Sequence, residues 1–324
     1  NLLQLSGTLS LNTFGALGDA TVVNATGLDF AATNVGGRLN ATATNGDLTG
    51  SAALAVGENA RFVANNGGIT IAAAGAINFG SLTFVSTGDV SIAEDSETVL
   101  SGLSTAINLN LSSSDVITND GTANIAVDNN AAFNGASITL GDQSGDVLNF
   151  GTLTFNSAGE VAITEDSATV LSGTGTAAAL SLRSNDTIDN DGTANVLVEN
   201  NAHFSGSSIT LNDVYQFGSL TFTSSGVVEI TEADATVLNG SSTASDLNLR
   251  SNDAITNDPS AIVSIDNNAT FRGTSITLGD QSGDVLNFGT LTFDSTGEVR
   301  IAEDSDIILG GTGTAESLEL LSTD

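Results

Sequence analysis

Short runs of alternating apolar and polar residues dominate the chain. Leu-Thr-Phe, Leu-Ser-Leu and Ile-Thr-Leu recur, and Gly, Asn, Asp and Ser separate them. Alternation with a period of two marks a strand that buries one face, and the separating residues favour turns. No stretch shows a convincing helical period. In one stretch after Phe150 the pattern predicts nine short strands: Leu153–Phe155, Val161–Ile163, Val170–Leu171, Leu180–Leu182, Thr187–Ile188, Val196–Val198, His203–Phe204, Ile209–Leu211 and Val214–Phe217.

The same segments return at a nearly fixed spacing. Four aligned copies begin with Phe62, Phe133, Phe204 and Phe271, so the steps along the chain are 71, 71 and 67. The short step arises in the third copy, where LNDVYQF replaces LGDQSGDVLNF. The chain therefore divides into a degenerate repeat at about 1–78, repeats at 79–149, 150–216 and 217–287, and a partial repeat at 288–324.

Nine strands in each repeat fit about three coils of three strands, with roughly 24 residues in each coil. We predict an all-β chain that forms a single continuous parallel β-solenoid over residues 1–324. Each strand would pair with the strand one coil above, and inward aliphatic and phenylalanine side chains would fill the bore. Propellers and sandwiches fit less well, because Asn-Gly and Asp-Gly hairpin turns between paired runs are scarce.

Charge changes the picture of possible partners. The chain has 38 acidic residues against six basic ones, a formal charge of −32. A nucleic-acid binder places Lys and Arg on phosphates, and anionic membrane surfaces attract the same residues. We therefore expect no nucleic-acid partner and no membrane insertion. The basic residues are all arginines: Arg38, Arg61, Arg183, Arg250, Arg272 and Arg300.

Other compositional features limit the chemistry. Cys is absent, so there is neither a disulfide nor a thiol, and no run of 18 apolar residues exists. No signal peptide opens the sequence at Asn1, so if the protein is secreted, we expect that the signal lies upstream of this sequence or was removed. Aromatic residues are 14 Phe and one Tyr. Because Phe can be buried completely, this bias favours a structural role for the aromatics.

Two repeated polar motifs invite a structural interpretation. Glu94-Asp95, Glu165-Asp166 and Glu303-Asp304 recur once in each repeat, and we hypothesise that a repeat of several coils keeps these charges more than a Debye length apart. Asparagine pairs such as Asn129-Asn130 precede the leading phenylalanines. They are interpreted as turn residues, with stacked amide ladders as the alternative.

Calcium is the cofactor that the sequence could support. Gly141-Asp142-Gln143-Ser144-Gly145-Asp146 and its copy Gly279-Asp280-Gln281-Ser282-Gly283-Asp284 place oxygen ligands on a Gly-rich turn, as hard cations require. Neither matches an EF-hand or a calcium-binding nonapeptide, and the third copy deletes the cluster at Asn212-Asp213. We therefore assign no cofactor and no metal ligand, and leave calcium as a possibility at these turns.

No catalytic residue can be assigned either. A carboxylate pair could support glycoside hydrolysis, but the acids follow the repeat rather than converge. The chain has one histidine, His203, at a position occupied by Ala132, Thr270 and Arg61 in other copies, so it is predicted to be a variable outward residue. Tyr215 is the only tyrosine and Trp is absent, which leaves few platforms for sugars. We expect the protein not to be an enzyme.

The repeat units resemble a known family. G-[ST]-L-T-F-x-S-x-G-x-V-x-I-x-E-D-S and F-x-G-x-S-I-T-L-G-D are similar to repeats of large bacterial exoproteins of the filamentous-haemagglutinin-like, repetitive adhesin type. The resemblance is strong from Phe79 onward and loose before it. It implies a right-handed parallel β-helix (β-solenoid), export to the cell surface, and a role in adhesion, biofilm or extracellular filaments.

These observations lead to one expected function and two alternatives. The chain is expected to be a structural shaft segment of an extracellular, cell-surface adhesin or filament, whose partners are itself or the surface of a host or neighbouring cell. The first alternative is a fibre subunit that joins end to end by strand addition, since the sequence stops in mid-repeat. The second is a carbohydrate-active β-helix enzyme.

Overall fold

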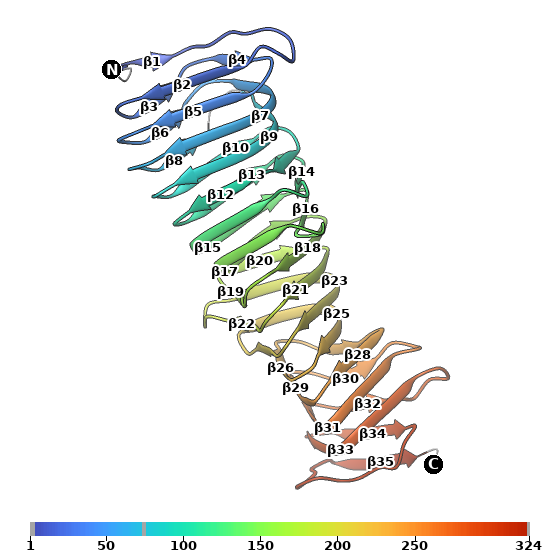
Figure 1. The fold of residues 1–324 in the computed structure, drawn as a ribbon. Helices are drawn as coiled ribbons and strands as arrows, with labels where there is room; N and C mark the ends of the chain where they lie inside the picture. The colour runs from blue at the N-terminus through green and yellow to red at the C-terminus, as the bar shows by residue number, and fades with distance from the viewer. Residues whose placement is uncertain (1–3, 73–75, 323–324) are drawn as a thin grey trace. The chain divides into compact units, whose positions relative to one another are not determined.

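The computed structural model describes residues 4–72 and 76–322 as strands joined by turns, and no helix occurs among them. The described residues thus contain no helix with the length and apolar character needed to span a bilayer. The chain divides into two compact units, Asn1–Asp166 and Ser167–Asp324. Within each unit the strands stack turn upon turn (Figure 1). Among the described residues, the strand pairings inside each unit are parallel.

The strands are short except where one strand continues through a bend. Those of the first unit are β1 (Thr8–Leu9), β2 (Ala20–Asn24), β3 (Leu28–Phe30), β4 (Thr33–Val35), β5 (Leu39–Ala43), β6 (Leu48–Gly50), β7 (Leu54–Ala64), β8 (Ile69–Ile71), β9 (Ile77–Ser86), β10 (Val90–Glu94), β11 (Thr98–Leu100), β12 (Leu103–Ala106), β13 (Leu109–Ser113), β14 (Val116–Asn119), β15 (Asn124–Gly135), β16 (Ser137–Leu140), β17 (Val147–Ser157) and β18 (Glu160–Glu165). Those of the second unit are β19 (Thr169–Leu171), β20 (Thr174–Ala177), β21 (Ala179–Ser184), β22 (Ile188–Asn190), β23 (Asn195–Gly206), β24 (Ile209–Leu211), β25 (Val214–Ser224), β26 (Val227–Glu232), β27 (Thr236–Leu238), β28 (Ser241–Ala244), β29 (Asp246–Ser251), β30 (Ile255–Asn257), β31 (Ile262–Gly273), β32 (Ile276–Leu278), β33 (Val285–Ser295), β34 (Glu298–Glu303) and β35 (Ser317–Ser322).

Strand β10 shows how the alternating pattern produces the core. Its Val90, Ile92 and Glu94 are buried, whereas Ser91 and Ala93 are half-exposed. The central Ile92 pairs in register with an isoleucine of β8 in the preceding turn and a leucine of β13 in the following one. Inward residues therefore stack on inward residues, and the prediction of a right-handed parallel β-solenoid is confirmed.

The turns are shorter than expected, and this changes where the repeats lie. Leu82 pairs with Leu100 one turn on, and Ile138 pairs with Val161 one turn on. A turn therefore takes roughly 18 to 23 residues rather than the roughly 24 predicted. From Leu82 on β9, the strands paired turn by turn are β11, β14, β16 and β18, so β16 lies three turns away and β18 four. Leu153, the residue equivalent to Leu82 in the next repeat, lies on β17, which falls between β16 and β18 along the chain.

One repeat thus spans about three and a half turns. Leu153 belongs to a second column of strands, in which it pairs with Ala131 and through it with Leu109. The second unit shows the same alternation, because Leu220 pairs with a residue of β27 whereas its equivalent Leu291 pairs with a residue of β31 in the other column. Successive copies of any residue therefore alternate between two columns within each unit.

Phenylalanine fills the core, as predicted. Thirteen phenylalanines are at most 5% exposed, and the exception, Phe14, is 80% exposed. A ring pair recurs in every copy, with centroids 5.5 Å apart for Phe62 and Phe79 and 5.4 Å apart for Phe271 and Phe288. Such tilted pairs add to the stabilisation from apolar burial.

The asparagine pairs lie at a bend inside the long strands. The register slips between Val127 and Asn130, and Asn130 Oδ1 accepts hydrogen bonds from the hydroxyls of Thr152 (2.9 Å) and Thr154 (3.1 Å) one turn later. The same two bonds to hydroxyls of the next turn are made by the equivalent asparagines, Asn59, Asn201 and Asn268. These side chains bond to hydroxyls rather than to one another, so neither the simple turn nor the amide ladder describes them fully.

Glycine is required opposite this bend. An added Cβ at Gly151 would lie 2.4 Å from the Asp128 carbonyl oxygen, and one at the equivalent Gly218 would lie 2.2 Å from the Glu199 oxygen. Backbone atoms cannot withdraw from such contacts without breaking the ladder. The Phe-Gly dipeptide of every repeat is therefore explained by close backbone approach.

The inward and outward faces of one strand provide a test of this architecture. Ile92→Ala should lower the free energy of unfolding by about 2–5 kcal/mol, because it opens a cavity against both neighbouring turns. Ser91→Ala on the same strand should change it by less than about 0.5 kcal/mol. Urea denaturation followed by circular dichroism measures both. Equal losses from the two variants would contradict the assigned faces.

Candidate functional site

The acidic Gly-rich turns use their carboxylates to hold their own backbone. Asp284 Oδ1 accepts the amide of Ser260 at 2.9 Å, and its Oδ2 accepts the amide of Gln281 at 3.0 Å. In the other copy, Asp146 Oδ2 accepts the backbone amide of the equivalent glutamine at 2.9 Å and the Asn119 side-chain amide at 2.8 Å. These bonds join each loop to neighbouring groups of the protein itself.

The remaining acid of each turn does not converge with the first. Asp142 and Asp280 are exposed, whereas Asp284 is buried. Among the described residues, no group of three or more His, Asp or Glu side chains could hold a metal ion. A calcium ion prefers six to eight oxygen ligands. The geometry therefore favours loop capping as the role of Asp146 and Asp284.

The single histidine and the single tyrosine do not form a sugar-binding arrangement. His203 is half-buried between inward Ala202 and Phe204, and burial together with the nearby Arg183 lowers its pKa. Tyr215 is fully buried on β25, and its hydroxyl has no hydrogen-bond partner among the described residues. Burial raises the pKa of Tyr215 strongly. A ring sealed in the core cannot serve as a platform for a carbohydrate.

The most unusual titratable groups are glutamates that the sequence suggests are surface charges. They end β10, β18, β26 and β34, and each is at most 3% exposed: Glu94, Glu165, Glu232 and Glu303. The alternation that buries Val90 and Ile92 also points Glu94 inward. Equivalent glutamates lie more than one turn apart, as the charge-spacing hypothesis requires, but their burial leaves little charge at these positions for the repeat to separate.

Burial favours the protonated form of three of these carboxyl groups. It raises the pKa of Glu94 to about 8, against the smaller opposing effects of the Thr98 hydroxyl and the Phe79 amide. It likewise raises the pKa of Glu232 to about 8 and that of Glu303 to about 7. Desolvation outweighs the hydrogen bonds because a buried anion loses far more hydration than one amide or hydroxyl restores.

The acid that follows each buried glutamate has a different role. Asp95 Oδ2 accepts the amide of Ile77 at 3.0 Å, and Asp304 Oδ2 accepts that of a leucine in β33 at 3.0 Å. In the fourth copy Ala233 replaces the aspartate, and Glu232 Oε2 accepts the backbone amide of Phe217 at 3.2 Å. The Glu-Asp motif is thus one inward acid and one cap. The sequence does contain a signal for the buried glutamate, because it occupies the next inward position after the apolar residues that alternate along its strand.

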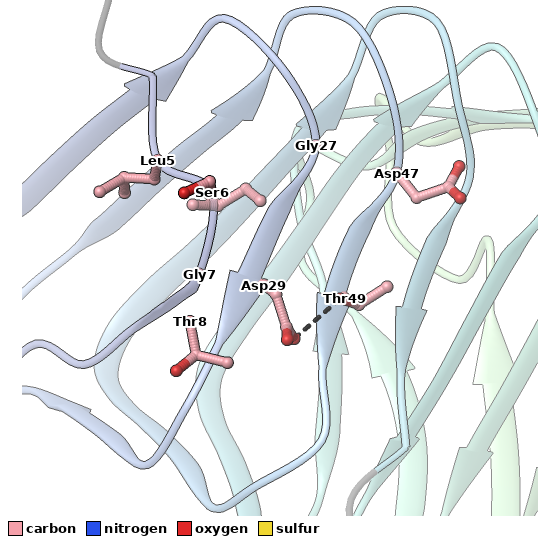
Figure 2. A pocket seen from close by; sticks show the side chains of 9 residues that line it. Leu5, Ser6, Gly7, Thr8, Gly27, Asp29, Asp47 and Thr49 are labelled. Carbon is pink, nitrogen blue, oxygen red and sulfur yellow. Dashed lines mark hydrogen bonds between the residues drawn. The ribbon is translucent and has the colours of Figure 1, made fainter.

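A groove of about 400 Å³ lies over the first turns of the first unit (Figure 2). The segment that leads into β1 forms one side, and Asp29, Asp47 and Thr49 line the other. The Thr49 hydroxyl donates to Asp29 Oδ1 at 2.8 Å, and Asp47 Oδ1 accepts the Gly68 amide at 2.9 Å. Both carboxylates are occupied within the fold, so the groove presents polar contacts but no paired acid and base among the described residues.

Comparison with known proteins finds a similar type of repeat, but one to which no function is assigned. A family model described as repeats of unknown function (DUF5649) matches residues 17–84 and 225–292. The two windows are of equal length, and together they cover less than half of the chain. The first window overlaps the residues in which the sequence predicts a degenerate repeat. No curated protein and no solved structure matches the chain.

The buried glutamates predict an unusual pH dependence. The pKa of Glu94 is near 4.5 in the unfolded chain and about 8 in the folded one, so its contribution to stability is complete below pH 4.5 and is lost as pH rises toward 8. Glu94→Gln should therefore leave stability unchanged near pH 4 and raise the unfolding free energy by about 2–5 kcal/mol near pH 9. Exposed Glu97→Gln is the matched control. Equal effects of Glu94→Gln at both pH values, measured by urea titration, would contradict the buried carboxyl.

The capping role of the acidic turns is tested by metal removal. EDTA should shift the thermal midpoint by less than about 1 °C, because amides rather than a cation satisfy Asp284. Asp284→Ala should cost about 1–3 kcal/mol by leaving two amides unpaired, and exposed Asp280→Ala should cost little. A large loss of stability with EDTA would assign calcium to these turns.

Proposed function

We propose that this chain is a structural shaft segment of a secreted, acidic, repetitive cell-surface adhesin or extracellular filament, and that it has no catalytic activity. The observation that carries the proposal is the in-register parallel ladder, which repeats with the same core in successive copies. An architecture in which each turn contacts only its neighbours can be extended by adding repeats. It builds length rather than an enclosed site.

The surface chemistry supports the same proposal. The acids at the Gly-rich turns and beside the first groove accept hydrogen bonds from the fold itself. A net charge of −32 opposes lateral clumping of long molecules. The similarity of the repeat units to filamentous-haemagglutinin-like exoproteins adds the cell surface as the location, and the protein itself or another cell's surface as the partner.

A second candidate is a fibre subunit that joins end to end. The parallel backbone pairing that joins β1 to β3 and β34 to β35 is the kind of contact that strand addition would extend. A free edge accepts an added strand from another molecule. This would make the self-association non-covalent.

Electron microscopy of the native material, labelled with an antibody to residues 1–324, tests both candidates. The shaft proposal expects label on the outside of intact cells, on fibres that keep their length in high-salt buffer and run as one long chain on denaturing gels. Fibres that resolve on such gels into short subunits would support strand addition. Label confined to the cell interior would overturn both.

A further inference from the structure

Two arginines stack on consecutive turns of the second unit. Arg250 on β29 pairs in register with Arg272 on β31, and both side chains point outward. Neighbouring parallel strands are about 4.8 Å apart, so the two guanidinium groups share one patch of surface. We name these residues the arginine pair. In a chain of charge −32, two adjacent cations are an exception that requires a reason.

No carboxylate forms an ion pair with the arginine pair within the described part of this unit. Arg38 and Arg300 each form an ion pair with a glutamate one turn away, at 2.9 Å and 3.0 Å. Arg272, by contrast, donates only a long bond of 3.5 Å to Asn248 Oδ1, and Arg250 has no side-chain partner among the described residues. Like charges this close repel each other unless an anion lies between them.

The nearby acids are engaged elsewhere. Asp253 Oδ1 accepts the Thr274 hydroxyl at 3.1 Å, and Glu229 Oε1 accepts a side-chain amide of β29 at 3.3 Å. Asp294 follows Arg272 in the same column, and it accepts a hydroxyl from the next turn. Asp294 is therefore the acid best placed, among the described residues, to compete for the arginine pair.

The fold does not require these arginines. In the first unit the equivalent column holds Ser112 in register with Asn134, followed by Asn156. The third copy holds Arg183 with Ser205, a single cation. Uncharged residues thus complete the same turn of the solenoid, and the arginine pair is a local addition to the surface of the fourth copy.

The arginine pair borders a groove that supplies further polar groups. The groove is about 250 Å³, and its lining includes Arg250, Arg272, Asp294, Asn252, Thr274 and Thr296. Guanidinium groups bind oxyanions through two parallel N–H bonds, which makes them suited to sulfate, phosphate and carboxylate groups. Hydroxyl and amide donors beside them can bind the remaining oxygens.

We propose that Arg250 and Arg272 form a binding site for one tetrahedral oxyanion, a sulfate or phosphate group that is either free or esterified to a saccharide. The site places one guanidinium fork from each of two turns on the same anion. It does not depend on the shaft proposal, since it requires only the second unit to be folded. It would give an otherwise acidic surface one point of attachment for an anionic partner.

Sulfate titration of the ¹⁵N-labelled chain tests the site through its arginine Nε–Hε signals. At constant ionic strength, the Arg250 and Arg272 signals should shift and saturate with a dissociation constant on the order of 1–10 mM. A sulfated disaccharide, run in parallel, distinguishes the sources: tighter binding than sulfate indicates an esterified ligand, and equal binding a free ion. Absence of a saturable shift with either probe would overturn the proposal.

The repeats supply matched variants that preserve the fold. Arg250→Ser and Arg272→Asn introduce residues from the second copy and should each weaken binding by at least about tenfold. Arg183→Ser should leave binding unchanged. Asp294→Asn, which introduces the residue found at the equivalent position Asn156, should strengthen binding several-fold by removing the competing carboxylate. Equal weakening by Arg183→Ser would show general charge attraction in place of a site. Weaker binding by Asp294→Asn would contradict a site in which Asp294 competes for the arginine pair.

Discussion

The structure depends on parallel backbone pairing between consecutive turns. The pairing stays in register, so that inward residues of one turn lie over inward residues of the next. A slip of one residue would turn every inward side chain outward. Phe133 is held in this way between Leu111 of one turn and Phe155 of the next. Because each inward residue contacts two neighbouring turns, one substitution affects three layers at once. The outward positions are free of this constraint and can differ between copies.

The same constraint explains the buried carboxyl groups. Glu94 follows Val90 and Ile92 on the same face of one strand, so the ladder that buries them must bury it too. A protonated glutamate can be accommodated there, whereas an ionised one loses its hydration. The acids of the chain therefore belong to two populations: those that cap turns or face solvent, and inward acids such as Glu232, whose pKa is raised by burial.

The half-turn in each repeat also separates equivalent residues. Leu82 and Leu153, which occupy the same place in successive copies, lie in alternate columns of the first unit. Copies are thus not stacked directly on one another, and a change in one does not meet its own equivalent one turn away. This leaves room for local chemistry such as the arginine pair, whose column holds serine and asparagine in another copy.

The sequence by itself determined the strands, their inward faces, the parallel stacking and the phenylalanine core. The alternation of apolar and polar residues and the internal repeat can both be read directly from the order of residues along the chain. Tertiary structure alone decided the length of a turn, the partners of Asn130 and Asp284, and the pairing of Arg250 with Arg272. Most of these features join residues from different turns of the solenoid. Which residues meet there is set by how the chain closes each turn, and no local pattern specifies that closure.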